Sequence, residues 1–281
     1  MTQPIRSEVV SANIAVHSRL ADVYDQTEPH FRPENQAKVA ARLQRLARST
    51  KARRMLDLGC GTGFMLSLGA DLFDCLDGID ATRSMLDRVD RSSGKITLHE
   101  DVVEALPFES NVFDVVTAYS FLDHLEDPLV VLREAHRVLV PSGILYVDLI
   151  PNRSFWSRIY EAEQRVVPGT FLDPIVVREV DELVRHEEKL ERTYGIRPED
   201  WRLAEPAKSE LKGFDPVDLA HQVSGLGFTD VEVRHEWFLG QAPVMHDTSN
   251  EMADAIDAHL RRLLPASEGL FKYLVLTARK P

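Results

Sequence analysis

Three alternate glycines after a short apolar run are the clearest sign of a ligand-binding loop in this sequence. The run from Met55 to Leu58 leads directly into Gly59, Gly61 and Gly63. Glycines allow a sharp turn and let a ligand approach the backbone, because they carry no Cβ to obstruct it. This loop is therefore the first candidate for a binding site.

Two carboxylates accompany the loop and indicate which ligand it holds. Asp57 lies inside the apolar run, and Asp80 ends the next such run, where a carboxylate can accept hydrogen bonds from both hydroxyls of a ribose. A dinucleotide site expects a third glycine where this chain has Phe64, and Asp57 would lie poorly beside a pyrophosphate. An adenosyl ligand with a cationic sulfonium and an amino-acid tail suits the two carboxylates better.

A parallel sheet would bring these residues to one edge. Strand-like and helical runs alternate from about residue 53 to 150, which is typical of βαβ units. The sequence predicts seven strands, at residues 55–58, 75–80, 96–100, 115–119, 144–149, 228–237 and 271–278. Helices are predicted at residues 36–50, 64–72, 83–90, 129–140, 216–227 and 250–264, with a turn at 140–143. The expected fold class is α/β, with a doubly wound, mostly parallel sheet.

This order of elements divides the chain into four segments. We expect an N-terminal helical lid in residues 1–50, a ligand-binding core in 51–150, a mainly helical insertion in 151–212, and the last two strands in 213–281. The insertion would cap the carboxyl edge of the sheet. Specificity for the second substrate is expected there, because variable segments at that edge surround the ligand crevice.

Composition and charge exclude several classes of protein. The chain has 281 residues, 44% of them hydrophobic and 28% charged, as in an ordinary globular protein. Its formal net charge of -12 argues against a nucleic-acid partner, because it repels phosphate backbones. No run reaches the roughly 18 apolar residues of a membrane span, and two cysteines cannot form a disulfide framework. We expect a cytoplasmic protein with no membrane or nucleic-acid partner, and a homodimer is left open.

The glycine loop and the segments after it resemble the Rossmann-like (class I) S-adenosylmethionine-dependent methyltransferases. Residues 56–63, Leu-Asp-Leu-Gly-Cys-Gly-Thr-Gly, are similar to the first motif of that family. Asp80 with residues 84–86 resembles the second motif, and residues 100–102, 106–108 and 113–116 resemble the third and fourth. The resemblance is dense over residues 55–148. It is strongest to the small-molecule methyltransferases, which include enzymes of quinone biosynthesis.

The resemblance implies S-adenosylmethionine as the cofactor and assigns roles to individual residues. The residues expected to contact it are Asp57, Gly59, Cys60, Gly61, Gly63, Asp80, Ala81, Met85, Asp101, Val102 and Tyr119. Asp57 and the glycine loop would hold the methionine part, and Asp80 the ribose. Asp101 and Val102 would contact the adenine amino group. For Met85, burial against the sheet is an equally good explanation.

His124 and Tyr24 are the candidates for work on the methyl acceptor. A base is needed only if the methylated atom carries a proton, and His124 follows the fourth predicted strand, where its imidazole can face a nucleophile. The alternative is that His124 only orients its loop. The family often has a Tyr-Asp pair in its helical lid, so Tyr24 would contact the methyl group or the acceptor, unless it merely anchors the first helix.

Other polar residues receive weaker assignments. Asp123 precedes a helix start and is interpreted as a capping or solvated residue. Its cluster with the neighbouring histidine and acids lacks the spacing of a metal site, so no metal is expected. His235 and His246 are outside candidates for the border of the pocket.

We therefore expect a transferase that moves the methyl group of S-adenosylmethionine to an oxygen or nitrogen of a small molecule. Two other functions stay open, because a fold alone does not fix an activity. One is a non-methylating enzyme that uses S-adenosylmethionine, and the other is a catalytically inactive protein that binds it. An unmethylated product would favour the first, and donor binding without turnover would favour the second.

Overall fold

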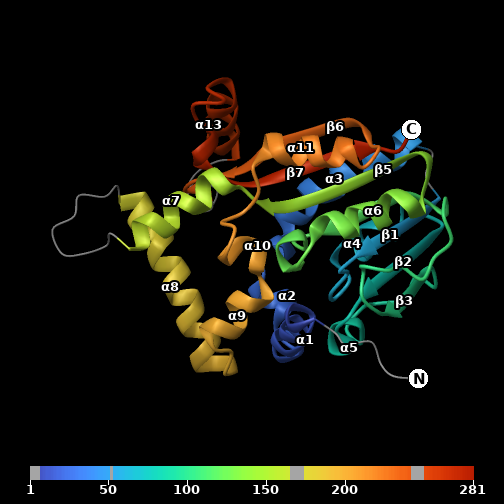
Figure 1. Ribbon diagram of the computed structural model, residues 1–281, viewed down its shortest axis with the longest axis horizontal. Coiled ribbons are helices and arrows are strands. Elements are labelled where there is room, and N and C mark those ends of the chain that lie inside the picture. Colours follow the sequence, from blue (N-terminus) through green and yellow to red (C-terminus); the bar gives the residue numbers. More distant parts are fainter. Residues whose placement is uncertain (1–6, 51–52, 165–173, 242–249) are drawn as a thin grey trace.

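A seven-stranded sheet runs through the computed structural model, which describes residues 7–50, 53–164, 174–241 and 250–281 (Figure 1). The strands are β1 (Arg54–Leu58), β2 (Cys75–Asp80), β3 (Ile96–Glu100), β4 (Phe113–Tyr119), β5 (Leu139–Pro151), β6 (Thr229–Phe238) and β7 (Phe271–Arg279). Their order in space is β3-β2-β1-β4-β5-β7-β6, and only β7 runs antiparallel to its neighbours within this sheet. The predicted seven-stranded, mostly parallel sheet is confirmed.

The strand order creates a ligand crevice at the carboxyl edge of the sheet. Strand β1 pairs with β2 on one side and with β4 on the other, so the chain winds outward from β1 in both directions. At such a switch point the loops after two neighbouring strands diverge, and a ligand fits between them. The loop after β1 is the glycine loop, and the loop after β4 carries His124.

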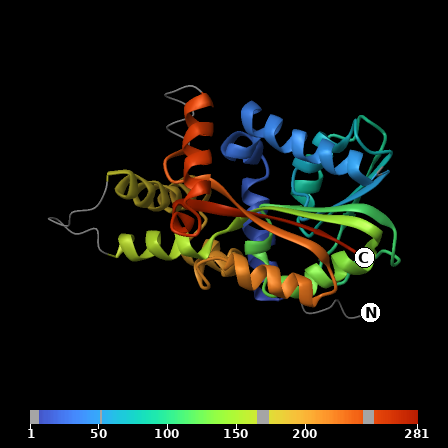
Figure 2. The ribbon, with the colours of Figure 1, turned by 90° about the horizontal axis from the view of Figure 1, so that it is seen from above.

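Alternation along the strands gives the sheet two apolar faces. In β1, Met55 packs into one hydrophobic cluster, whereas Leu56 and Leu58 pack into another. Helices α6 (Pro128–Val138) and α11 (Pro216–Gly225) cover the face of Leu56, and α3 (Pro33–Thr50) and α4 (Phe64–Gly69) cover the face of Met55. Figure 2 shows these two helical layers on opposite sides of the sheet. Each fully buried aliphatic side chain contributes roughly 1.5–3 kcal/mol to the stability of the folded state. This packing therefore fixes the strands whose carboxyl ends carry the candidate site residues.

The first helices and the insertion meet below the carboxyl edge. Helices α1 (Glu8–Leu20) and α2 (Tyr24–Thr27) lie before α3, and the insertion forms α7 (Arg153–Glu163), α8 (Pro174–Tyr194), α9 (Pro198–Ala204) and α10 (Pro206–Ser209). Val16 and Leu20 of α1 share an apolar cluster with Leu190, Ile196 and Ala204 of the insertion. Figure 1 shows α9 directly beside α1. The two segments therefore form one cover over this side of the molecule.

Some element boundaries differ from the predicted ones. Residues 140–143 were predicted to turn out of a helix, but they belong to β5, which already begins at Leu139. Leu139 pairs with Phe113 and Ile144 pairs with Val115, with a shift of register between the two pairs. A bulge can absorb extra residues within a paired strand, which explains why the Pro-Ser-Gly sequence does not end it. Helices α4 and α5 (Arg83–Leu86) are shorter than predicted.

Candidate active site

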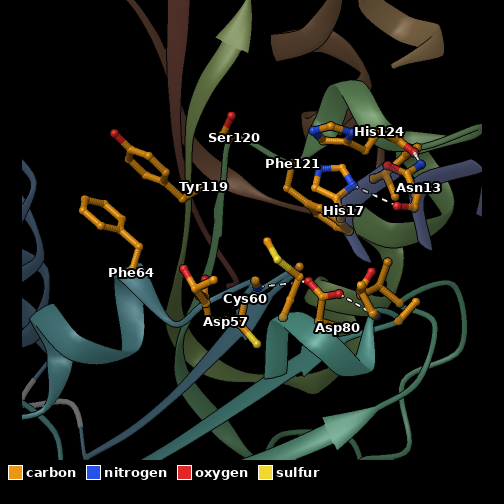
Figure 3. A pocket seen from close by; sticks show the side chains of 18 of the residues that line it. Asn13, His17, Asp57, Cys60, Phe64, Asp80, Tyr119, Ser120, Phe121 and His124 are labelled. Carbon is orange, nitrogen blue, oxygen red and sulfur yellow. Dashed lines mark hydrogen bonds between the residues drawn. The ribbon is translucent and has the colours of Figure 1, made fainter. Parts of the chain in front are cut away.

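A pocket opens at the crevice beside β1 and β4 (Figure 3). Most predicted site residues line it, namely Tyr24, Asp57, Gly59, Cys60, Gly61, Asp80, Ala81, Met85, Asp101, Val102, Tyr119 and His124. Gly63 is not among the lining residues, because it turns the chain into α4 behind the loop, with φ of 92°.

The glycine loop requires a residue without a side chain at its first position. Gly59 has φ of 65°, in the left-handed region that favours glycine. A Cβ at this position would lie 2.1 Å from Cδ2 of Phe121. Phe121 belongs to the loop after β4, so the absence of a side chain on Gly59 lets the two loops of the crevice come into contact.

Gly59→Ala is expected to destabilise the fold by about 2 to 4 kcal/mol, because backbone strain of about 1–2 kcal/mol adds to the overlap with Phe121. Gly94→Ala is the matched control, since Gly94 has φ of 69° but no atom within 4 Å of the added Cβ. Gly94→Ala should therefore lower the free energy of unfolding only by the backbone strain. Urea unfolding of both variants measures the free energies, and equal losses would show that Phe121 moves aside freely.

Asp80 connects the glycine loop to the turn after β2. Its Oδ2 accepts a hydrogen bond from the backbone nitrogen of Gly61 at 2.9 Å, and its Oδ1 accepts one from that of Thr82 at 2.8 Å. Burial raises the pKa of Asp80, and these two hydrogen bonds oppose the rise. A carboxylate has about four acceptor sites, so Asp80 can still accept hydrogen bonds from ligand hydroxyls in the pocket.

Asp57 lies on the floor of the pocket, with its side chain almost completely buried. Its Oδ1 accepts a hydrogen bond from Oγ1 of Thr117 at 2.6 Å. Burial raises the pKa of Asp57 to about 7; the bond from Thr117 opposes this rise and nearby Asp80 adds to it. A cationic ligand group would lower the pKa again and keep the carboxylate ionised, which suits a ligand with a sulfonium and an ammonium group.

His124 reaches the pocket from η2 (Leu122–His124), the short turn after β4. Its Nδ1 lies 3.0 Å from the carbonyl oxygen of Ala204, at the end of α9. A carbonyl oxygen only accepts, so Nδ1 carries a proton, and in the neutral tautomer the lone pair is on Nε2. The insertion thus fixes the tautomer that a general base needs.

Two further histidines, His17 and His30, line the pocket, and neither was a predicted site residue. Burial, together with nearby His124, lowers the pKa of His17 to about 4, and burial alone lowers that of His30 to about 4, so both are neutral imidazoles. The His17 ring lies 5.1 Å from that of His124, and Figure 3 shows the two rings next to one another. Asn13 donates to the backbone oxygen of His124 at 3.0 Å. The i, i+4 spacing of Asn13 and His17 places both on one face of α1, but only the tertiary structure shows what that face meets.

A hydrogen bond to Asp25 connects the N-terminal helices to the glycine loop. Oγ1 of Thr62 donates to Oδ1 of Asp25 at 2.5 Å. The neighbouring Tyr24 lines the pocket, with its ring 6.0 Å from His30 and 6.2 Å from His17. The Tyr-Asp pair therefore lies at the crevice, with one residue holding the loop and the other facing the pocket.

Of the two outside candidates, only His235 lies in the described part of the chain, and it does not line this pocket. His235 lies on β6, with its ring 5.5 Å from that of Phe271, and is not a lining residue. His246 lies outside the described residues.

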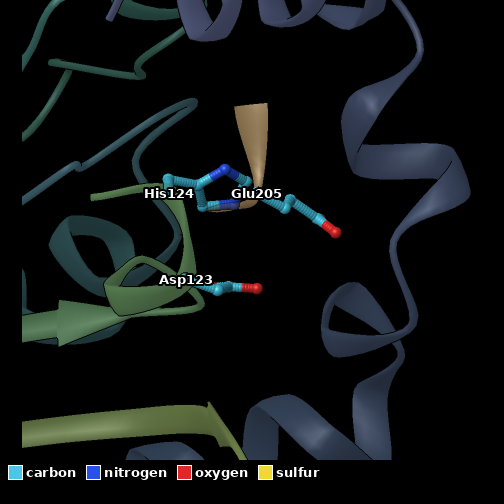
Figure 4. A group of neighbouring side chains, drawn as sticks. All are labelled: Asp123, His124 and Glu205. Atoms are coloured by element: carbon cyan, nitrogen blue, oxygen red, sulfur yellow. The ribbon is translucent and has the colours of Figure 1, made fainter. Parts of the chain in front are cut away.

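The interpretation of Asp123 as a capping or solvated residue is wrong. It is only 5% exposed, because α10 packs against η2 and covers it. One polar atom each of Asp123, His124 and Glu205 lie within 4.8 Å of one another (Figure 4). Sequence reasoning could not find this cluster, since Glu205 comes from the insertion.

The fold and the pocket together define a Rossmann-like methyltransferase fold with a site for an adenosyl ligand. Residues 56–147 match the model of a family described as a methyltransferase domain. The fold is also found in phosphoethanolamine N-methyltransferase 2 of Haemonchus contortus, with a TM-score of 0.57 and 17% identity; the alignment covers 100% of this chain and 61% of that one.

Curated proteins of known sequence point to the same family. A ubiquinone biosynthesis O-methyltransferase from Histophilus somni is 30% identical over 42% of this chain and 53% of its own length. A probable S-adenosylmethionine-dependent methyltransferase from Mycolicibacterium smegmatis is 27% identical over 72% of this chain and 67% of its own length. The matches thus span about half to two thirds of these relatives. Residues 56–147 thus match a methyltransferase domain, and these similarities support a class I S-adenosylmethionine-dependent methyltransferase with S-adenosylmethionine as its cofactor.

Proposed function

We propose that the protein transfers the methyl group of S-adenosylmethionine to an oxygen or nitrogen of a small molecule. The observation that carries this proposal is that His124 and Tyr24 line the same pocket as Asp57 and Asp80. Bound S-adenosylmethionine supplies a methyl group on a sulfonium leaving group. The protein therefore has mainly to align the acceptor and to exclude water.

The cofactor side of the pocket is formed by the core. In this proposal Asp80 binds the ribose, and Asp57 with the glycine loop binds the methionine part. Asp101, whose Oδ1 accepts a hydrogen bond from the backbone nitrogen of Val102 at 2.8 Å, binds the adenine amino group. Met85 is 2% exposed and also lines the pocket, so packing on the adenine and burial against the sheet are compatible roles.

The acceptor side is formed by the cover of α1, α2 and the insertion. His124 would take a proton from the acceptor through Nε2, and Tyr24 would contact the acceptor or the methyl group. The neutral rings of His17 and His30 would help to exclude water. The lid role of residues 1–50 and the specificity role of residues 151–212 belong to the same proposal.

A small-molecule acceptor, rather than a nucleic acid, follows from the formal net charge of -12. We place the reaction in the cytoplasm, because Cys60 is buried, Cys75 is exposed, and both are free thiols. Separately, none of the helices in the described ranges has both the length and the apolar composition of a membrane span.

Methyl-tritiated S-adenosylmethionine is expected to label at least one member of a panel of phenols, alcohols and amines, and to leave RNA, DNA and protein unlabelled. Label in a macromolecule alone would contradict the small-molecule acceptor. Cofactor binding without transfer to any acceptor would favour a catalytically inactive protein. A modified donor with its methyl group still attached would favour the non-methylating enzyme.

A further inference from the structure

Asp123 is a buried carboxylate without a hydrogen-bonding or ionic partner for its Oδ1 in the described part of the chain. Burying an unpaired charge is unfavourable, and burial accordingly raises the pKa of Asp123. The residue follows β4 and precedes His124, which lines the cofactor pocket. An unsatisfied acid at this edge therefore calls for a partner that a substrate could supply.

Glu205 and His124 provide two more polar groups at the same place. Figure 4 shows the side chains of Asp123 and Glu205 extending in the same direction beside the ring of His124. Glu205 already has a cationic partner, because Nζ of Lys208 lies 3.0 Å from its Oε2, with both side chains largely buried. Lys208 compensates Glu205, and within the described ranges Asp123 takes part in no ion pair.

Further ionisable groups lie near this cluster. Burial and the proximity of Glu205 raise the pKa of Glu28 to about 7, and the nearby Lys208, His124 and Lys189 oppose this rise. Tyr24 lines the cofactor pocket, and burial together with the nearby carboxylates of Glu28, Asp80, Asp123 and Glu205 raises its pKa. Its aromatic ring offers a face that attracts cations.

We propose that the acceptor is an amine that binds as an ammonium ion to Asp123, with Glu205 and His124 as further hydrogen-bond acceptors. This inference rests on the proposed methyl transfer, because it names the class of acceptor for that reaction. An ammonium group has up to three N–H donors, which match one oxygen of Asp123, one of Glu205 and Nε2 of His124. The ammonium charge gives Asp123 its missing partner, whereas a carboxylate or phosphate in its place would be repelled.

A divalent metal ion is the competing occupant of these three groups, and Lys208 argues against it. Lys208 already compensates Glu205, which leaves Asp123 as the carboxylate of the cluster without an ion pair in the described ranges, and one uncompensated negative charge matches a singly charged cation. The ammonium of a substrate can also lie nearer to Asp123 and farther from Lys208. The arrangement therefore favours a singly charged organic cation.

The ammonium must lose a proton before its nitrogen can react. In this proposal one N–H bond breaks and the proton moves to Nε2 of His124, while Asp123 and Glu205 hold the two remaining N–H groups. The nitrogen lone pair then forms the new C–N bond as the C–S bond breaks, and the electron pair of the C–S bond stays on sulfur. The products are the methylated amine and S-adenosylhomocysteine, with one proton released to solvent.

Three probes that share one scaffold test the charge preference. Tyramine carries a cation, tyrosol a neutral hydroxyl and 4-hydroxyphenylacetate an anion at the same position. Calorimetry on the S-adenosylhomocysteine complex is expected to show tyramine binding at least about tenfold more tightly than tyrosol, and no binding of the anion. Butylamine, butanol and butyrate repeat the comparison without an aromatic ring. If neither amine binds more tightly than its neutral analogue, the proposal is wrong.

Asp123→Asn removes the charge at nearly constant shape and is expected to reduce the tenfold preference to about threefold or less. Glu126→Gln is the matched control, because Glu126 lies on the same loop but is exposed, and the preference should remain. A normal affinity for S-adenosylhomocysteine shows that each variant is folded. An unchanged amine preference in Asp123→Asn would overturn the proposal, as would Asp123-dependent binding of Mn²⁺ without amine binding.

The two proposals fail in different ways. Wild-type protein that binds S-adenosylhomocysteine but no amine contradicts the amine inference alone. Protein that binds the amine with the expected preference, but transfers no methyl group to any acceptor, contradicts the proposed function.

Discussion

His124→Ala is expected to lower the turnover number by about 10² to 10⁴ and to leave the affinity for S-adenosylhomocysteine within about threefold of wild type. The reason is that Nδ1 of His124 is committed to the carbonyl of Ala204, so the lone pair of Nε2 is available to take the proton of the acceptor. The residue lies on the loop after β4 and holds none of the cofactor's hydroxyl groups in our assignment. Steady-state kinetics and calorimetry separate the two effects.

His124→Asn and His17→Ala make this test specific. Asparagine can keep a hydrogen bond to Ala204 but cannot act as a base near neutral pH. The turnover number of His124→Asn should therefore be as low as that of His124→Ala. His17 is a second neutral imidazole, with its ring centre 5.1 Å from that of His124. Its replacement by alanine should lower the turnover number much less than His124→Ala does. A large loss in His17→Ala with near-normal turnover in His124→Asn would transfer the role of base to His17.

Asp80→Ala is expected to weaken the binding of S-adenosylmethionine by about 10- to 150-fold, which corresponds to roughly 1.5–3 kcal/mol for losing a charged acceptor. The structure adds a reason to expect the upper part of this range. The same carboxylate accepts hydrogen bonds from the backbone nitrogens of Gly61 and Thr82, so its loss also loosens the glycine loop. Calorimetry with S-adenosylmethionine and S-adenosylhomocysteine measures the change.

Asp87→Ala provides the control for Asp80→Ala. Asp87 follows α5, is exposed and pairs with Arg83, so its removal should leave cofactor affinity unchanged. An unchanged affinity in a folded Asp80→Ala protein would mean that the ribose binds elsewhere. A similar loss in both variants would indicate a general effect on this part of the fold.

The cofactor half of the site could be predicted from the sequence because its signals are local. The glycine loop, Asp57 and Asp80 lie within two adjacent βα units, and short apolar runs identify the buried β1 and β2. Parallel strands bring their carboxyl ends to a common edge, so these residues had to converge once the sheet was recognised. Local spacing did not determine the exact bounds of β5, since pairing with β4 and a bulge set its start.

The acceptor half of the site could not be predicted from the sequence, because it is formed by contacts between distant segments. The sequence placed His124 after a strand but could not show that Ala204 of the insertion orients its ring, or that His17 of α1 lies beside it. Asp123 has the local pattern of a surface residue and is buried only because α10 covers it and Glu205 approaches it. Periodicity reports which face of an element is apolar, whereas the partner of a polar face depends on how separate elements pack. The amino-acid sequence by itself therefore determined the fold class and where the cofactor binds, and only the tertiary structure decided which charges surround the acceptor.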